Sequence, residues 1–329
     1  MSGKALRDHN ASPLLDRKAG SSNKGSIGKS LSGNNIENVD MQNSKNLNQD
    51  ATAIKTSSEA AKLTDAVPEI VCPEIEYVES ENLNDLPDVD AHLATLLDRL
   101  DSKDWLMVCE ALTHARQLSI FHKEAMLPIL ANEIILIVKS VKNPRSALCK
   151  TAIMASSDLF KAYQDQMIDY LDPLLLQLFL RSSQDKRFVA EAAEKALIMM
   201  TTCISPNLLV HKLQPYVKHK NPRIRAKASV CICRSVQRLG LEGIKDYGLD
   251  TLLQIAASQL SDQLPEAREA ARILALELRS VYDKYVFGHQ LQEEVAQPPS
   301  NNDAWEQFCK TKLSTINALA VIRVTTATT

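Results

Sequence analysis

The chain has 329 residues, of which 45% are hydrophobic and 24% charged, so it cannot be disordered throughout. Its formal net charge of −2 gives no overall field of either sign, and nucleic acid is not an expected partner. No apolar run approaches the ~20 residues that cross a bilayer, so no membrane contact is expected. The charge is uneven, however: residues 1–90 carry 9 basic and 15 acidic groups, and residues 91–290 carry 26 and 21.

The N-terminal part is predicted to lie outside the folded body. Residues 1–76 contain no Phe, Trp or Tyr, and the first 65 are rich in Ser, Asn, Lys and Gly. Such a composition cannot bury enough apolar surface to offset chain entropy. From Ala66 to Asp90 there are eight acidic residues and no basic one. We therefore expect a disordered tail and an acidic linker over residues 1–87, with residues 1–85 removable from the body.

Residues 88–287 are predicted to form an all-α solenoid. Apolar residues recur at three- and four-residue spacing, as in Leu93, Leu96, Leu97 and Leu100, and no convincing strand is found. Polar breaks follow one another at intervals of 35 to 43 residues, which is the period of HEAT or armadillo helical pairs. They lie at 101–105, 142–145, 182–187, 219–223 and 262–266. The expected fold is an α-α superhelix of about five pairs with one continuous core.

Each break resembles the start of a helix. Asp or Asn is available as a cap, and Pro144, Pro222 and Pro265 are expected at the first helical position. Charged groups near these starts, such as Arg225 and Asp262, are candidates for bridges between adjacent pairs. Lys150 is a third candidate of this kind.

Residues 288–329 form a separate C-terminal segment with a candidate short helix. Trp305, Phe308 and Leu313 make one stretch of it amphipathic. This stretch either caps the last helical pair or docks a further protein partner.

Catalytic and metal chemistry have no candidate residues. Gly28-Lys29-Ser30 resembles the end of a phosphate-binding loop, but Asn23 stands where the first glycine is required. Cys231 and Cys233 are two apart on a predicted helix, so their side chains diverge by about 200° and cannot chelate one ion. The seven cysteines are an odd number scattered through apolar stretches, which favours reduced thiols. We predict no enzyme, no cofactor and no metal.

The turns within the pairs are predicted to line up along one side of the solenoid, which we call the turn edge. Its candidate partner-binding residues are Trp105, Arg145, Lys186, Arg187, Lys220, Arg223 and Arg268. Exposed Trp and Arg are the residues most often found as binding anchors. The alternative is that the tryptophan covers the first turn of its own helix and that the cations are solvated or paired within the solenoid.

At these turns the sequence resembles the TOG domains of the CLASP and crescerin families, over about residues 88–287. The resemblance is carried by five fragments in order, namely Ser102–Trp105, Ser146–Ala152, Ser183–Ala193, Asn221–Ala228 and Glu266–Ala271. Each fragment alone is common in HEAT proteins, whereas their order is more specific.

The resemblance implies a protein that binds tubulin or microtubules through the turn edge and regulates microtubule organisation or dynamics in the cytoplasm. In these families a first-turn aromatic packs on β-tubulin, and basic residues of later turns face its acidic surface. Trp105 would then be the apolar anchor, with Lys186, Arg187, Arg223 and Arg268 as electrostatic contacts. The second hypothesis is a general HEAT/armadillo scaffold that binds a peptide or protein complex on its second helices, without tubulin.

Overall fold

The computed structural model describes residues 75–290 and 301–327. The chain divides into two units, Met1–Ile70 and Val71–Thr329, and the described residues belong to the second. They form helices and connecting turns, with no strand in either described range. The disorder predicted for residues 1–74 lies outside the described residues.

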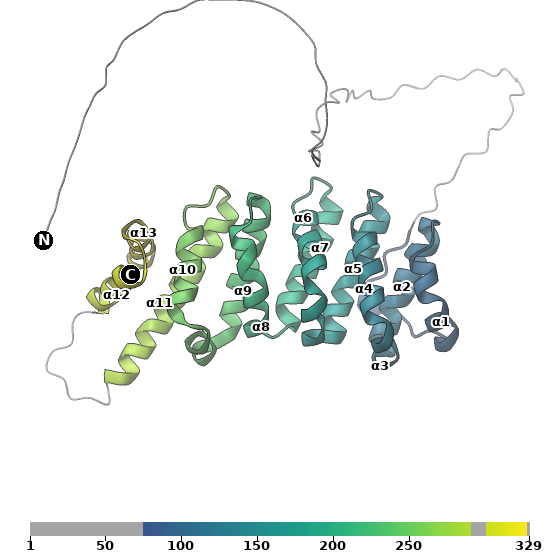
Figure 1. The fold of residues 1–329 in the computed structure, drawn as a ribbon, viewed down its shortest axis with the longest axis horizontal. Coiled ribbons are helices and arrows are strands. Elements are labelled where there is room, and N and C mark those ends of the chain that lie inside the picture. The colour runs from purple at the N-terminus through teal and green to yellow at the C-terminus, as the bar shows by residue number, and fades with distance from the viewer. Residues whose placement is uncertain (1–74, 291–300, 328–329) are drawn as a thin grey trace, which may run out of the picture. The chain divides into compact units, whose positions relative to one another are not determined.

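The helices follow one another as antiparallel neighbours (Figure 1). The α-helices are α1 (Val89–Leu100), α2 (Trp105–Phe121), α3 (Lys123–Met126), α4 (Leu130–Val141), α5 (Ser146–Tyr163), α6 (Leu171–Arg181), α7 (Arg187–Cys203), α8 (Pro206–Leu213), α9 (Pro222–Tyr247), α10 (Leu249–Gln259), α11 (Pro265–Gln290), α12 (Asn301–Lys312) and α13 (Thr315–Thr326). Short 3-10 helices are η1 (Ser80–Asn82), η2 (Leu127–Ile129), η3 (Gln164–Tyr170) and η4 (Gln214–Lys218).

Five helical pairs form the body, which confirms the predicted α-α superhelix. The pairs are α1 with α2, α4 with α5, α6 with α7, α8 with α9, and α10 with α11. The second helices pack in sequence, α2 on α5, α5 on α7, α7 on α9 and α9 on α11. Their buried apolar residues belong to one contiguous cluster that extends from Leu86 to Val321. Each pair therefore buries its apolar face against its neighbours, as expected of a solenoid.

The helix starts at the first and fourth breaks occur as predicted. The Asp104 carboxylate accepts the N–H of Leu106 at 3.0 Å and caps α2, so the break that precedes it ends in a defined turn. Asn221 caps α9 in the same way, because its side-chain oxygen accepts the N–H of Arg223 at 2.9 Å. Pro222 follows as the first residue of that helix, where a missing N–H costs nothing.

The expected position of Pro144 is wrong. Helix α5 begins two residues later, at Ser146, and Arg145 occupies the cap position. The first helical hydrogen bond of α5 runs from the N–H of Cys149 to the carbonyl of Arg145 at 3.0 Å, whereas in α9 the equivalent bond runs from Arg225 to the carbonyl of Asn221, before the proline. Pro265, by contrast, begins α11 as expected.

The acidic linker packs on the body from residue 75 onwards, which corrects the predicted start of the folded part near Asp88. We call residues 75–87 the strap. Leu83 and Leu86 of the strap are only 8% and 9% exposed, and the backbone carbonyl of Asn84 accepts the side-chain amide of Gln117 at 2.8 Å. The prediction failed because the many acidic residues of this segment suggested that it is solvated. The strap nevertheless contains enough apolar residues to pack along the second helices.

The C-terminal segment forms a hairpin of two helices, α12 and α13, rather than one short helix. The Trp305 side chain is fully buried, and its ring centroid lies 5.1 Å from that of Tyr282 on α11. Its indole N–H donates to the Thr325 hydroxyl of α13 at 2.9 Å. Of the two roles considered, capping the last pair or docking a partner, this tryptophan has the first, because it joins the hairpin to the last pair.

Candidate functional site

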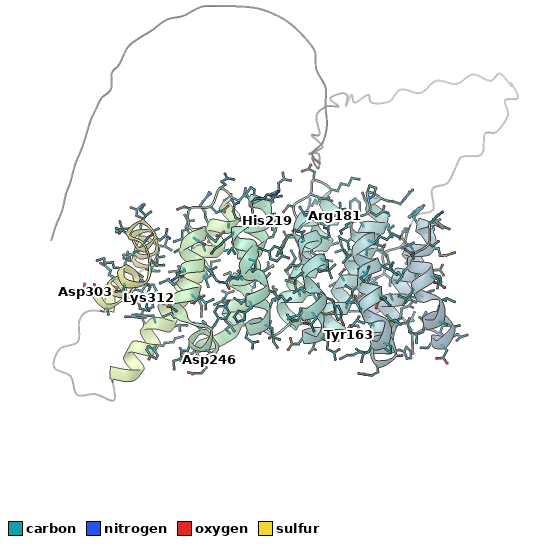
Figure 2. The ribbon with its side chains drawn as sticks, viewed as in Figure 1. Tyr163, Arg181, His219, Asp246, Asp303 and Lys312 are labelled. Carbon is teal, nitrogen blue, oxygen red and sulfur yellow. The ribbon has the colours of Figure 1, made fainter. Side chains whose placement is uncertain are left out.

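The turns within the pairs lie along one edge of the solenoid. Arg181 ends α6 and His219 follows η4, and both lie at the upper edge in Figure 2. Tyr163 and Asp246, which belong to the connections between pairs, lie at the opposite edge. The turn edge predicted from the repeat is therefore a continuous feature of the described body.

Trp105 lies in the first turn of this edge as the first residue of α2. Its side chain is half-buried and packs against the core, and the preceding Asp104 caps the helix. The guanidinium carbon of Arg145, from the second turn, lies 4.3 Å from the centroid of the indole ring. A cation at this distance over an indole face is attracted by the ring quadrupole. The structure thus brings two of the predicted site residues together as a stacked pair.

Two further cations reach back by one turn in the same manner. The ammonium of Lys186 donates to the Ser146 hydroxyl at 2.7 Å, and Nη1 of Arg223 donates to the backbone carbonyl of Ser183 at 3.1 Å. In both cases the partners are 40 residues apart in the sequence. These contacts join the second turn to the third and the third to the fourth. The sequence left open whether these side chains contact a partner or pair within the solenoid, and their spacing of one repeat was the available signal for the internal contact.

The side chains of the remaining three predicted residues differ in how far contacts within the protein restrict them. Arg187 is 90% exposed on its side chain and pairs with Glu191 of its own helix at 2.7 Å. Lys220 is exposed, and no ion pair of its ammonium occurs among the described residues. Arg268 is folded onto its own turn, where Nη1 donates to the carbonyls of Asp262 at 2.7 Å and Gln263 at 2.9 Å. The most available cations are therefore Arg187 and Lys220.

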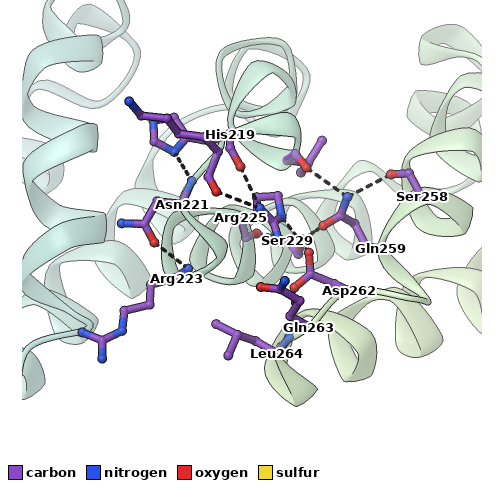
Figure 3. A network of polar contacts seen from close by, with 12 residues as sticks. His219, Asn221, Arg223, Arg225, Ser229, Ser258, Gln259, Asp262, Gln263 and Leu264 are labelled. Atoms are coloured by element: carbon purple, nitrogen blue, oxygen red, sulfur yellow. Dashed lines mark hydrogen bonds and ion pairs between the residues drawn. The ribbon is translucent and has the colours of Figure 1, made fainter. Parts of the chain in front are cut away.

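Arg225 connects the fourth turn to the fifth, as expected for a bridge between pairs (Figure 3). Its Nε donates to Asp262 at 2.7 Å, and the Asp262 side chain is only 4% exposed. Its Nη1 donates to the backbone carbonyls of His219 at 2.9 Å and Lys220 at 3.2 Å. One guanidinium thereby fixes the backbone of the fourth turn, including the residue that carries the free ammonium. This supporting role was predicted, but the contact with the turn's own carbonyls was not.

A buried polar cluster continues this support below the turns (Figure 3). The amide nitrogen of Gln259 donates to the Val217 carbonyl at 3.0 Å, and its oxygen accepts the Ser229 hydroxyl at 3.1 Å. Gln259 is on α10, Ser229 on α9, and Val217 on η4. Three elements are therefore held together directly beneath the fourth and fifth turns.

Lys150, the third candidate bridge, has no ion pair with a carboxylate in the part of the chain that the structure describes. Its ammonium lies 3.7 Å from the ring centroid of Tyr77 in the strap and 5.9 Å from that of Phe188 on α7. It bridges α5 and α7 through aromatic rings and holds the strap on both.

The described residues contain no group of three or more His, Cys, Asp or Glu side chains that could hold a metal ion. Burial raises the pKa of the Cys231 thiol to about 12 and that of Cys233 to about 11, so both stay protonated and are poor nucleophiles and ligands. None of the described helices is long and apolar enough to cross a membrane. The phosphate-loop-like fragment at Gly28 lies outside the described residues.

Comparison with known proteins adds the family. The family model described as CLASP N terminal matches residues 121–285. The chain is 29% identical over 203 residues to the mouse "TOG array regulator of axonemal microtubules protein 1", which covers 60% of this chain and 11% of the relative. It is 31% identical over 114 residues to the human protein of the same name, covering 35% of this chain and 7% of the relative. The chain thus spans about a tenth or less of the length of these relatives.

Solved structures with a similar fold include the MAST/Orbit N-terminal domain, with a TM-score of 0.48 and 13% identity over 71% of this chain and 96% of that chain. A second is the structure reported under "TOG-tubulin binding specificity promotes microtubule dynamics and mitotic spindle formation", with a TM-score of 0.45 and 13% identity. It matches over 59% of this chain and 74% of that chain.

Proposed function

Because the chain belongs to the CLASP N-terminal family, whose model covers residues 121–285, we propose that it binds tubulin or microtubules through its turn edge. The mouse and human relatives are named as regulators of axonemal microtubules. By this proposal the protein regulates microtubule organisation or dynamics in the cytoplasm, by binding rather than by chemistry. The binding unit comprises the five helical pairs, residues 88–287, together with the strap.

The observation that carries the proposal is the arrangement of the turn edge. Trp105 stands in the first turn beneath Arg145, and the turns after it present exposed cations at Lys186, Arg187 and Lys220. A rigid aromatic anchor beside a row of cations is suited to a partner with an apolar spot and an acidic surface. Tubulin is the partner that the family suggests.

In this mechanism the edge is prepared before the partner arrives. Contacts between successive turns already restrict Arg145, Lys186 and Arg223, so less side-chain freedom is lost on association. Arg187 and Lys220 extend into solvent and steer an acidic surface towards the edge.

The scaffold hypothesis places the partner on the second helices instead. There the strap already lies over part of the surface, since Val78 and Ser80 contact Arg116 of α2, and Glu79 lies 3.7 Å from Lys195 of α7. The turn edge has no such cover among the described residues. This difference in access favours the turn edge as the first site to test.

The test is gel filtration with unpolymerised tubulin, alongside co-sedimentation with microtubules. We expect wild type to bind, and the double variant Arg187→Glu with Lys220→Glu to bind more weakly in low salt. The matched control is Lys161→Glu with Lys284→Glu, two exposed lysines outside the turns, which should bind like wild type. Absence of wild-type binding in both experiments would refute the proposal, and equal loss in the control would move the site away from the turn edge.

A further inference from the structure

The strap crosses the second-helix face through contacts that recognise an extended chain. Nη1 of Arg116 donates to the backbone carbonyl of Val78 at 2.9 Å, and the Ser80 hydroxyl donates to Asp158 at 2.5 Å. Arg116 and Asp158 are themselves paired at 2.6 Å, with side chains only 2% and 3% exposed. A buried, mutually oriented pair therefore presents one donor and one acceptor to the strap.

Two further contacts hold the strap side chains on either side of Val78, namely those of Tyr77 and Glu79. The Tyr77 ring lies under the Lys150 ammonium, with Phe188 of α7 near the same cation. Two residues later, the Glu79 carboxylate lies 3.7 Å from the Lys195 ammonium. The surface thus has one position that accepts an aromatic side chain and one that accepts an acidic side chain. We call the surface formed by Arg116, Lys150, Asp158, Phe188 and Lys195 the strap groove.

The strap has one firmly attached half and one weakly attached half. Residues Leu83 and Leu86 are buried and tie the second half to the body. Residues 75–80 are held by polar contacts and by Ile75 and Tyr77, which pack on the body but stay partly exposed. A segment without a fully buried apolar side chain opens at lower cost. A cavity of about 130 Å³ also remains between this half and the helices, lined by Met154 and Phe188 among others. The strap does not fill the groove that it occupies.

We propose that the strap groove is a docking site for an extended acidic peptide of a protein partner, and that residues 77–80 occupy it in cis. The peptide would carry an aromatic residue and, three positions later, Ser or Thr, with a carboxylate between them, as in Tyr77-Val-Glu-Ser80. The groove suits this charge, since Arg116, Lys150 and Lys195 outnumber the two helix carboxylates beside it, those of Asp158 and Glu191. The inference does not rest on tubulin binding, because it concerns another face and another partner.

A segment tethered next to its own site has an effective concentration of the order of millimolar, so it excludes weak competitors. A partner peptide therefore binds only when it makes better use of the groove or when the weakly attached half is released. The strap would act as a filter on which peptides gain access to the second helices.

The test uses the full chain and a fluorescein-labelled peptide with the sequence of residues 75–82, followed by fluorescence anisotropy. Tyr77→Ala with Ser80→Ala removes strap contacts and leaves the groove intact. Glu76→Ala with Glu81→Ala is the matched control, since both residues are exposed and neither has an ion pair among the described residues. Hydrogen exchange of residues 75–82 reports whether the strap is seated.

We expect the release variant to bind the peptide about tenfold or more tightly than wild type does, because the cis competitor is weakened. The control should behave as wild type. Adding Lys150→Ala to the release variant should weaken the peptide at least about fivefold, since a cation on an aromatic ring is lost. No gain in affinity despite faster exchange in the strap would overturn the proposal. Unchanged exchange in the release variant would overturn it too, because the strap would then be a fixed part of the fold.

Discussion

The side chains of the turn edge serve the fold and the proposed site together. Arg145 covers one face of Trp105, and Lys186 and Arg223 each bond to the preceding turn. A substitution here therefore removes a contact between turns as well as a contact with a partner. Arg187 is the exception, since its contact lies within its own helix, and its variants report on partner binding most directly.

Arg225 should behave as a structural residue. Arg225→Ala leaves the buried Asp262 carboxylate without its guanidinium and two carbonyls of the fourth turn without their donor. We expect the free energy of unfolding to fall by about 2 kcal/mol, the usual cost of an unpaired buried group. Urea denaturation measures it, with Arg187→Ala as the exposed control near zero. A loss of tubulin affinity with unchanged stability would contradict this assignment.

Glu133 on α4 makes stability depend on pH. Its side chain is fully buried, neither carboxylate oxygen has a hydrogen-bond partner among the described residues, and burial raises its pKa from 4.5 to about 8. Between these values the folded state keeps a proton that the unfolded state loses. Glu133 therefore favours folding at low pH, and its contribution is lost as the pH rises towards 8. The free energy of unfolding falls by at most about 1.4 kcal/mol per pH unit in this range.

Glu133→Gln should remove that dependence, because an amide does not titrate. Urea denaturation at pH 5, 7 and 8.5 should show the variant gaining stability relative to wild type as the pH rises. The difference between the two proteins isolates Glu133 from other titrating groups. A constant difference across the three pH values would show that the carboxyl is ionised throughout.

Among the helices, the repeat of polar breaks was the most informative sequence feature. It located the five turns, because a solenoid needs a turn at every repeat whatever its side chains do. It missed the start of α5, where Arg145 rather than Asn143 is the residue before the helix. It also missed the stack of Arg145 on Trp105, since no local pattern shows which side chains meet across turns. Contacts at a spacing of one repeat could have been sought, but their geometry needed the structure.

Removal of the strap should destabilise the body, contrary to what the composition suggested. A chain that begins at Asp88 loses the burial of Leu83 and Leu86, each contributing about 2 kcal/mol. Its thermal midpoint should lie several degrees below that of a chain beginning at residue 75. Differential scanning calorimetry of both chains measures this, with the full chain as reference. Equal midpoints for the two shortened chains would mean that the strap adds nothing to stability.

The hairpin of α12 and α13 should depend on one side chain. Trp305 packs against Tyr282 and Phe308 and bonds to Thr325, so it joins the hairpin to α11. Trp305→Ala should lower the free energy of opening the hairpin by about 3–5 kcal/mol, so the hairpin should open locally more often. Hydrogen exchange should then accelerate in residues 301–327 and stay unchanged in α5. Trp305→Phe, which keeps most of the ring packing, is the milder control.

The described body has two candidate binding surfaces that differ in how they are prepared for a partner. The turn edge is preorganised by contacts between turns, and the strap groove is filled in cis. The positive charge of residues 91–290, with 26 basic and 21 acidic groups, would attract an acidic partner from a distance. Association through the turn edge should therefore weaken as salt rises, because exposed charges are screened beyond about 8–10 Å.

The most direct test of the turn edge is the tubulin affinity of wild type and Trp105→Ala at two ionic strengths. Circular dichroism confirms that both proteins are folded. We predict that the substitution weakens binding about thirtyfold or more, the effect of removing an anchor of roughly 2 kcal/mol. Wild type should bind more weakly at the higher ionic strength, because the cations of the edge remain part of the contact. Equal affinities of the two proteins at both ionic strengths would contradict the account.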